Sequence, residues 1–176
     1  EFCLQEAEVN LDQVNWITIG RNPKAKLSKK LWFLLQDPFA GFNTVKTRFQ
    51  NRKKISSLEK EFAIHFGADI SAIKSKIKHI EHHRSHMASA FFPSPFDESA
   101  ILSIDGSGDF TTTMIGAGKG SHIEVMDSVD FPVSCGLFYT AFTQFLGFPH
   151  YGDEYKVMGL APYGQPKYAD KVRQVL

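Results

Sequence analysis

The chain has 176 residues, of which 43% are hydrophobic and 22% charged, with a net charge of +1. This balance is typical of a soluble globular protein. No apolar run approaches the ~20 residues that a membrane-spanning helix needs, and the first residues lack the basic and apolar segments of a signal peptide.

Both ends of the sequence lie inside predicted helices. The chain starts without Met within a helical pattern over 2–9, and it stops within another at 171–176. We therefore expect a fragment, with sequence missing upstream. The two cysteines, Cys3 and Cys135, are far apart and form no metal or redox motif. Free thiols in a reducing compartment are expected, which favours the cytoplasm.

Positive charge is concentrated in one segment. Between Arg21 and Lys60 there are eleven Lys or Arg and two acidic residues, against nine basic and seventeen acidic residues elsewhere. We favour a solvated surface insertion over the alternative, a surface for an anionic partner such as a nucleotide, RNA or an acidic protein face.

The hydrophobic pattern predicts alternating helices and strands in the first half of the chain. The predicted elements are a helix at 2–9, a strand at 14–19, a helix at 57–66, a strand at 76–80 and a histidine-rich helix that ends at Pro93. Between the first strand and the second helix, residues 21–57 are expected to form an irregular basic insertion. Within it, the apolar patch Leu31–Leu35 makes at most two helical turns.

A second group of elements follows a proline-rich break at 93–97. A buried strand at 100–104 leads into a turn at 105–109, and strands at 110–117 and 122–126 complete a β-hairpin meander. Helices are expected at 137–146, at 154–161 and from Pro166 onward. The order predicts an α/β chain in two parts, 1–95 and 96–176.

Four of the seven histidines fall within eight residues: His79, His82, His83 and His86. On a helix, His82 and His86 share one face and can bind one ion, and His83 with His86 is a second possible pair. Imidazole suits iron, zinc, nickel or copper. The alternative is a polar, partly solvated helix start without a metal. His79 and His83 are expected to belong to such a start in either case.

Asp105 is a natural third ligand, because it ends a hydrophobic strand where a buried carboxylate needs a cation or hydrogen-bond donors. Gly106 and Gly108 let the backbone turn tightly and let its amide groups approach a ligand. Successive amides in such a turn form a cradle for phosphate. A tight β-turn between paired strands is the simpler interpretation, and it is compatible with the cradle.

A third candidate segment is Gly152–Gly164. Asp153 is expected to cap a helix whose first turn contains Glu154 and Lys156. A lysine near an anion-binding turn can bind phosphate or stabilise a developing negative charge. A surface lysine without a role is the equal alternative.

Together these stretches resemble the NodU/CmcH-type O-carbamoyltransferase family, which includes nodulation and antibiotic-tailoring enzymes. The matching segments are His82–Phe91, Ser94–Phe96, Asp105–Asp109 and Glu154–Gly164, in the family's order and spacing. The resemblance implies a partial ASKHA fold, which is actin/Hsp70-like and of ribonuclease H type. Residues 1–95 would be the C-terminal part of its first lobe and 96–176 the N-terminal part of its second.

The resemblance also implies chemistry. The family uses ATP and carbamoyl phosphate to form carbamoyl-adenylate, and it transfers the carbamoyl group to a hydroxyl of a small molecule or sugar. A divalent metal, expected to be Fe(II), takes part. The implied roles are metal ligands at His82, His86 and Asp105, nucleotide binding at Gly106, Ser107, Gly108 and Asp109, and catalysis at Lys156.

Some parts of the family pattern have no counterpart here. The first phosphate loop, a further metal-binding aspartate and the C-terminal domain that first processes carbamoyl phosphate are missing, so the chain alone is expected to be inactive. A small-molecule or sugar acceptor is favoured over nucleic acid, and no membrane partner is expected. The open alternatives are a tRNA threonylcarbamoyl-transfer-like enzyme, a non-catalytic nucleotide-binding module on the same fold, and a purely structural metal site.

Overall fold

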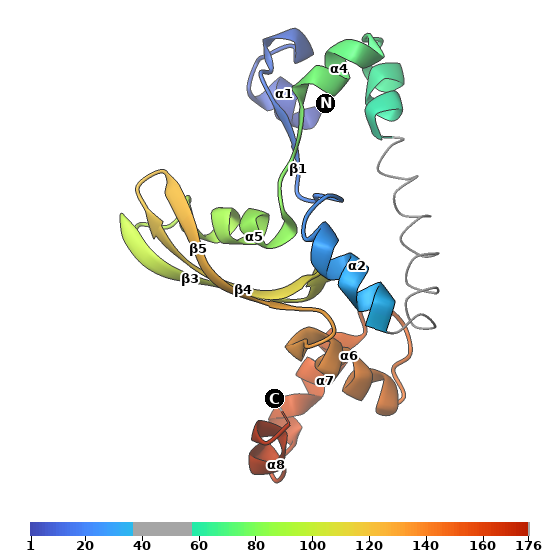
Figure 1. The fold of residues 1–176 in the computed structure, drawn as a ribbon, viewed down its shortest axis with the longest axis vertical. Coiled ribbons are helices and arrows are strands. Elements are labelled where there is room, and N and C mark those ends of the chain that lie inside the picture. Colours follow the sequence, from blue (N-terminus) through green and yellow to red (C-terminus); the bar gives the residue numbers. More distant parts are fainter. Residues whose placement is uncertain (37–57, 176) are drawn as a thin grey trace. The chain divides into compact units, whose positions relative to one another are not determined.

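A computed structural model describes residues 1–36 and 58–175 (Figure 1). It has the mixed α/β composition that the sequence predicts. The residues group into two compact units, Glu1–His82 and His83–Leu176. The boundary between them falls at the start of the histidine-rich helix, before the proline-rich break. The assignment of residues 1–95 and 96–176 to two ASKHA lobes stays a prediction.

The first unit contains short helices and a two-stranded parallel sheet. Its elements are α1 (Phe2–Glu6), the 3-10 helix η1 (Leu11–Gln13), β1 (Ile17–Ile19), α2 (Leu27–Gln36), α4 (Ile70–Lys76) and β2 (Ile77–His79), and residues 58–66 are also helical. In the sheet, Ile17 lies opposite Ile77 and Ile19 lies opposite His79.

Two helices of this unit differ from the prediction. Residues 27–36, expected to be mostly irregular, form the ten-residue helix α2, in which Leu, Lys and Gln are good helix formers. Helix α4 was not predicted; Asp69 caps it, because its carboxylate accepts a hydrogen bond from the Ala72 amide. The last residue of α4, Lys76, is the first residue of the strand expected at 76–80. The rest of the basic insertion, residues 37–57, lies outside the described residues, and so does the first residue of the helix expected at 57–66.

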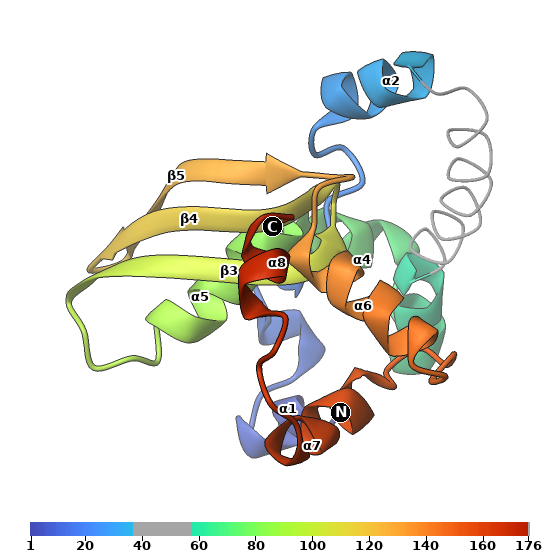
Figure 2. The same cartoon turned by 90° about the horizontal axis from the view of Figure 1, so that it is seen from below.

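The second unit contains a three-stranded antiparallel meander, as predicted. Its strands are β3 (Glu98–Gly108), β4 (Thr111–Lys119) and β5 (His122–Asp130), in the order β3-β4-β5. Figure 2 shows the three strands side by side. Ile104 pairs with Thr113, and Lys119 pairs with His122.

The glycine-rich segment is not the turn that the sequence predicts. Strand β3 continues to Gly108, which pairs with Thr111, and the register is irregular between Ile104 and Gly108. The tight turn is made by Asp109 and Phe110, which have positive φ angles of 53° and 84°. Positive φ at both central residues gives the right-handed twist that a two-residue hairpin needs. Residues 105–107 therefore form an irregular strand end.

Helix α5 (His82–Phe91) lies along one face of the meander (Figures 1 and 2). Met87 and Phe91 form the core with Ile101 and Met114. Strand β4 is glycine-rich beneath them: a Cβ at residue 116 would be 2.4 Å from the Met87 Cε, and one at residue 118 would be 2.7 Å from the Phe91 ring. The helix therefore packs close to the strand backbone.

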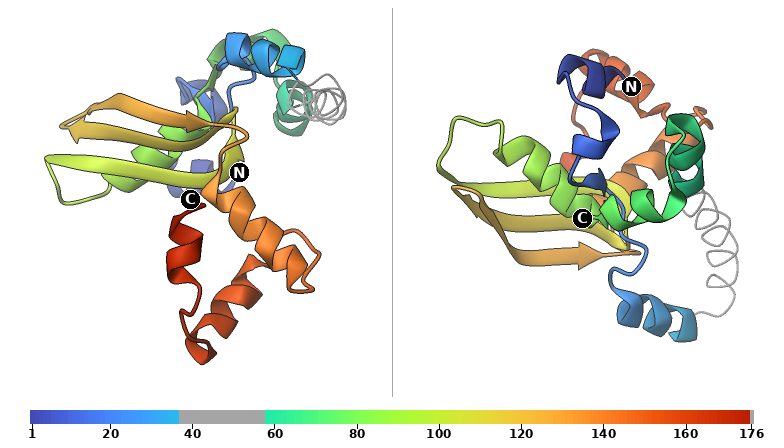
Figure 3. Two further views of the ribbon diagram at one scale, coloured as in Figure 1. Left: turned by 60° about the horizontal axis from the view of Figure 1, so that its bottom comes forward. Right: turned by 90° about the horizontal axis from the view of Figure 1, so that it is seen from above.

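Three helices follow the meander, close to the predicted positions (Figure 3). They are α6 (Cys135–Phe145), α7 (Glu154–Leu160) and α8 (Ala169–Arg173), with the 3-10 helix η2 (Ala161–Tyr163) after α7. The Ser134 hydroxyl caps α6 by accepting a hydrogen bond from the Leu137 amide at 3.0 Å. In the described part of the chain, no helix has the length and apolar character to span a bilayer.

Candidate metal centre

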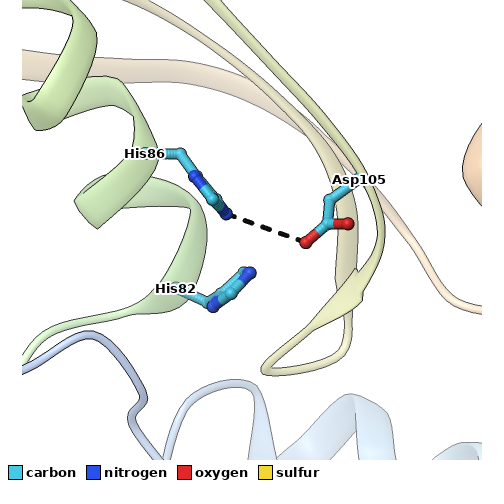
Figure 4. A group of neighbouring side chains, drawn as sticks. All are labelled: His82, His86 and Asp105. Atoms are coloured by element: carbon cyan, nitrogen blue, oxygen red, sulfur yellow. Dashed lines mark ion pairs between the residues drawn. The ribbon is translucent and has the colours of Figure 1, made fainter. Parts of the chain in front are cut away.

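The structure brings together His82, His86 and Asp105 (Figure 4). One ligand atom from each residue lies within 4.8 Å of the other two. Two atoms that bind one tetrahedral ion at about 2.1 Å lie about 3.4 Å apart, so each pair would have to approach by at most about 1.4 Å for all three atoms to reach one ion. Two imidazoles and one carboxylate are a donor set that suits Fe(II) and Zn(II). The residues fit the predicted metal.

Helix α5 places the two histidines relative to each other. His82 is its first residue and His86 lies one turn further on, so the helix backbone puts both rings on one face. The His82 Nδ1 lies 3.2 Å from the carbonyl oxygen of Gly20. Because a carbonyl oxygen only accepts hydrogen bonds, Nδ1 carries the hydrogen, and Nε2 keeps its lone pair for a metal.

Asp105 is oriented by its own neighbour. Its Oδ1 accepts a hydrogen bond from the Gly106 amide at 2.6 Å, while its Oδ2 lies 3.7 Å from the His86 Nε2. If His86 were protonated, this contact would be a half-exposed ion pair, which contributes at most about 1 kcal/mol. Such a pair would not require His82. A shared ion would engage all three side chains.

The start of helix α6 braces the backbone of Asp105. The Ser134 hydroxyl donates to the Gly106 carbonyl oxygen at 2.7 Å. Gly136 lies so close that a Cβ there would be 2.6 Å from the Gly106 nitrogen and 2.7 Å from the Asp105 carbonyl carbon. Sequence reasoning missed both residues. A serine that can cap a helix, followed by a glycine in the first turn, was the available signal.

His83 and His79 have other partners. Contrary to the expected solvated helix start, His83 is fully buried. Its Nδ1 lies 2.8 Å from the Ser103 hydroxyl and its Nε2 lies 3.0 Å from the Thr111 carbonyl oxygen. Because protein atoms engage both ring nitrogens, His82 with His86 is the pair that remains for a metal. His79 is exposed in β2, with its Nδ1 2.9 Å from the Arg21 carbonyl oxygen.

The four residues expected to bind nucleotide lie at the end of β3 and in the turn after it. The Gly106 amide is donated to Asp105, so it is already engaged in this conformation. Ser107 is exposed and Gly108 is buried. Asp109 is the first residue of the tight turn. Their contact with a nucleotide stays a prediction.

Lys156 forms a short ion pair with Asp153, from its Nζ to the Oδ1 at 2.7 Å. The other oxygen of Asp153 accepts a hydrogen bond from the His150 amide at 3.0 Å. The predicted cap is therefore wrong: the Asp153 carboxylate makes no capping bond to α7, because it is engaged by these two donors. Lys156 is not one of the three clustered side chains, and its catalytic role stays a prediction.

Hydrogen bonds at the start of α7 shift the pKa values of Asp153, Glu154 and Lys156. The hydrogen bond from Lys156 lowers the pKa of the largely buried Asp153, and the same bond raises the pKa of Lys156. The Thr140 hydroxyl, 2.7 Å from the Glu154 carboxylate, lowers the pKa of Glu154. Thr140 belongs to α6, so this bond ties α7 to α6.

Replacing Asp153 by asparagine is expected to flatten the acid side of the stability profile. A lowered carboxyl pKa stabilises the fold at pH values above the ordinary 3.8, and this contribution is lost as the pH falls through the lower folded value. Urea unfolding between pH 2 and 7 should show the difference between wild type and Asp153→Asn shrinking on acidification. The control is Asp170→Asn, which breaks an exposed pair with Arg173. A constant difference at every pH would contradict the expectation.

Comparison with known proteins agrees with the resemblance seen in the sequence. A family model described as "Carbamoyltransferase N-terminus" matches residues 1–176. The uncharacterized protein sll1178 of Synechocystis is 37% identical over 175 residues, which cover 97% of this chain and 28% of that protein.

Two nodulation proteins match a shorter stretch. Nodulation protein NolNO of Sinorhizobium fredii is 43% identical over 101 residues, or 57% of this chain and 14% of that protein. Nodulation protein NolO of Bradyrhizobium diazoefficiens is 43% identical over 96 residues, or 54% of this chain and 17% of that protein. The chain spans less than a third of the length of each of these relatives.

Proposed function

This chain belongs to the carbamoyltransferase N-terminus family, and on that premise we propose that it supplies part of the active site of an O-carbamoyltransferase. The enzyme would form carbamoyl-adenylate from ATP and carbamoyl phosphate, and would then transfer the carbamoyl group to a hydroxyl of a small molecule or sugar. The cluster of His82, His86 and Asp105 is the observation that supports this most directly. Because the relatives are several times longer, we propose that the chain works within a longer protein.

The three clustered side chains would hold the metal. A divalent ion, which we expect to be Fe(II), would polarise the carbamoyl carbonyl as a Lewis acid and so lower the barrier to attack by a hydroxyl. The protein's own contribution is to orient the donors. The Gly20 carbonyl oxygen fixes the tautomer of His82, and the Gly106 amide fixes the rotation of the Asp105 carboxylate.

The nucleotide would lie at the irregular end of β3. We keep Gly106, Ser107, Gly108 and Asp109 as the proposed nucleotide-facing residues, because they follow the metal ligand Asp105 directly and because the amides of such a segment can reach phosphate oxygens. The Gly106 amide would then have to exchange Asp105 for a phosphate. The phosphates would then lie beside the proposed metal centre.

Lys156 would stabilise negative charge that develops during transfer. Replacing it by methionine is expected to lower kcat about 100- to 1,000-fold, the typical effect of removing one charge-stabilising donor. The steady-state rate of carbamoyl transfer by the full-length protein is the measurement. Lys119→Met is the matched control, because Lys119 is exposed and pairs with Glu98. If the Lys156→Met protein transfers carbamoyl as fast as the control, Lys156 has no role in catalysis.

The proposed activity is tested with the full-length protein, ATP and carbamoyl phosphate. Mass spectrometry should detect carbamoyl-adenylate, and a sugar hydroxyl should gain a carbamoyl group. A parallel reaction with tRNA as the acceptor separates the tRNA-modifying alternative. Nucleotide binding without any turnover would overturn the transferase and favour a nucleotide-binding module.

A further inference from the structure

The buried face of helix α5 contains one polar residue among apolar ones. His83, Met87 and Phe91 recur every four residues, and each is at most 4% exposed. Met87 and Phe91 pack against the glycines of β4, as expected for the apolar stripe of a helix. The imidazole of His83 loses its hydration on burial, which is unfavourable unless protein atoms replace the lost hydrogen bonds. The presence of His83 there therefore requires a specific reason.

His83 connects the helix to two strands at once. Its Nε2 donates to the carbonyl oxygen of Thr111 in β4, at 3.0 Å. A carbonyl oxygen only accepts, so Nε2 carries the hydrogen and Nδ1 can accept from the hydroxyl of Ser103 in β3, at 2.8 Å. Ser103 lies two residues before Asp105, and His83 lies between His82 and His86. The two hydrogen bonds therefore join the backbone segments that carry the metal ligands.

We propose that His83 is a positioning residue for the metal centre, which fixes the rotation of α5 so that His82 and His86 face Asp105. The inference rests on the proposed function only in that it assumes the three residues bind a metal. His83 acts through the ligands and binds no metal itself, because its ring nitrogens hold Ser103 and Thr111.

A small rotation of helix α5 is enough to move His82 and His86 out of metal-binding distance. An imidazole lies roughly 6 Å from the axis of its helix, so a rotation of about 20° moves it by about 2 Å. Metal–ligand distances tolerate about 0.2 Å. Apolar packing of Met87 and Phe91 is non-directional, whereas hydrogen bonds weaken steeply when they are bent. Both bonds of His83 are directional contacts on the buried face of α5.

The test compares the loss of hydrogen bonds with a change of apolar packing on the buried face of α5. In the full-length protein, His83→Leu keeps the bulk and removes both hydrogen bonds, Ser103→Ala removes one of them, and Met87→Leu changes the packing without touching either. For each variant, the Co²⁺ dissociation constant is measured by competition with a chromophoric chelator. The visible spectrum of bound Co²⁺ reports the coordination geometry, and thermal unfolding of the metal-free protein reports stability.

We expect His83→Leu to weaken Co²⁺ binding about 10- to 100-fold, the usual effect of losing a partner that orients ligands, and to alter the Co²⁺ spectrum. Ser103→Ala should act in the same direction but less. Met87→Leu should lower stability while changing the Co²⁺ affinity less than about twofold. His83→Gln, whose amide can still donate to the Thr111 carbonyl oxygen, should recover part of the affinity that leucine loses.

Three results would overturn the role of His83. One is a folded His83→Leu protein with the wild-type Co²⁺ affinity and spectrum. Another is a Met87→Leu protein that loses as much affinity as His83→Leu. If His83→Leu does not fold, unchanged Co²⁺ binding in both Ser103→Ala and His83→Gln would overturn it as well. Failure of the wild-type protein to bind Co²⁺ is a separate outcome, which removes the metal centre itself and the proposed function with it.

Discussion

Replacing both His82 and His86 by alanine is expected to abolish metal binding by the full-length protein, from about one ion per chain to none. The change removes two of the three donor atoms that lie within 4.8 Å of one another. Of these three donors it leaves only the half-exposed Asp105, and carboxylates without imidazoles suit Mg²⁺, Ca²⁺ or Mn²⁺ better than Fe²⁺. Elemental analysis after anaerobic loading with Fe²⁺ and removal of excess metal gives the stoichiometry.

The matched control for this variant is His122→Ala. His122 is an exposed histidine at the start of β5, so its removal tests whether any surface histidine affects loading. The control should bind the wild-type amount of metal. If the double variant also keeps the wild-type amount, the assignment of His82 and His86 as ligands is wrong.

Replacing Gly136 by alanine should disturb the same site by displacing the backbone of Asp105. The added Cβ would lie 2.6 to 2.7 Å from backbone atoms of Asp105 and Gly106, and no side-chain rotation can relieve a clash with backbone. Either α6 or the end of β3 has to move, at a cost of about 1–3 kcal/mol in the free energy of unfolding. Because the Asp105 carboxylate moves with its backbone, Co²⁺ binding should also weaken at least about tenfold.

Gly159→Ala provides the comparison for this substitution. Gly159 lies in helix α7, and a Cβ there would have no atom within 4 Å. Alanine favours the helix by about 1 kcal/mol over glycine, so stability should rise or stay the same, and Co²⁺ affinity should not change. Urea unfolding and Co²⁺ titration of both variants give the answer. A Gly136→Ala protein as stable as Gly159→Ala would show that the contact between α6 and Asp105 is not tight.

The elements set by local pattern could be predicted from the sequence. The apolar spacing of the histidine-rich segment and the prolines after it define α5, and alternating strands with a glycine-containing connection define the meander. The pairing of His82 with His86 follows from helix geometry. Asp105 followed from its place at the end of an apolar strand, and the structure does bring it to the histidines.

The features that depend on distant partners could not be predicted in this way. The burial of His83 depends on Ser103 and Thr111, which are 20 and 28 residues away. The spacing of His83 with Met87 and Phe91 places it on the apolar face of the helix, but it is these two distant partners that replace the hydrogen bonds an imidazole loses there. Glu154 likewise takes its partner from α6, in Thr140. In each case a hydrogen bond across the fold decides the environment.

The turn after β3 was misplaced for a related reason. Gly106 and Gly108 favour a turn by composition, but the chain turns at Asp109 and Phe110. Asp tolerates a positive φ, whereas a bulky residue such as Phe rarely adopts one. Phe110 is held there by tertiary contacts: its ring packs on Phe131 at 5.9 Å between centroids, and its carbonyl oxygen accepts from the Phe131 amide at 2.9 Å.

The metal centre is tested most directly by diffraction from crystals of the full-length protein loaded with Co²⁺. Data collected at the cobalt absorption edge locate the ion without reference to activity. The strongest anomalous peak is predicted between His82, His86 and Asp105, within about 2.3 Å of one atom of each side chain. A fully loaded crystal whose strongest peak lies elsewhere, or touches none of these three residues, would contradict the proposed site.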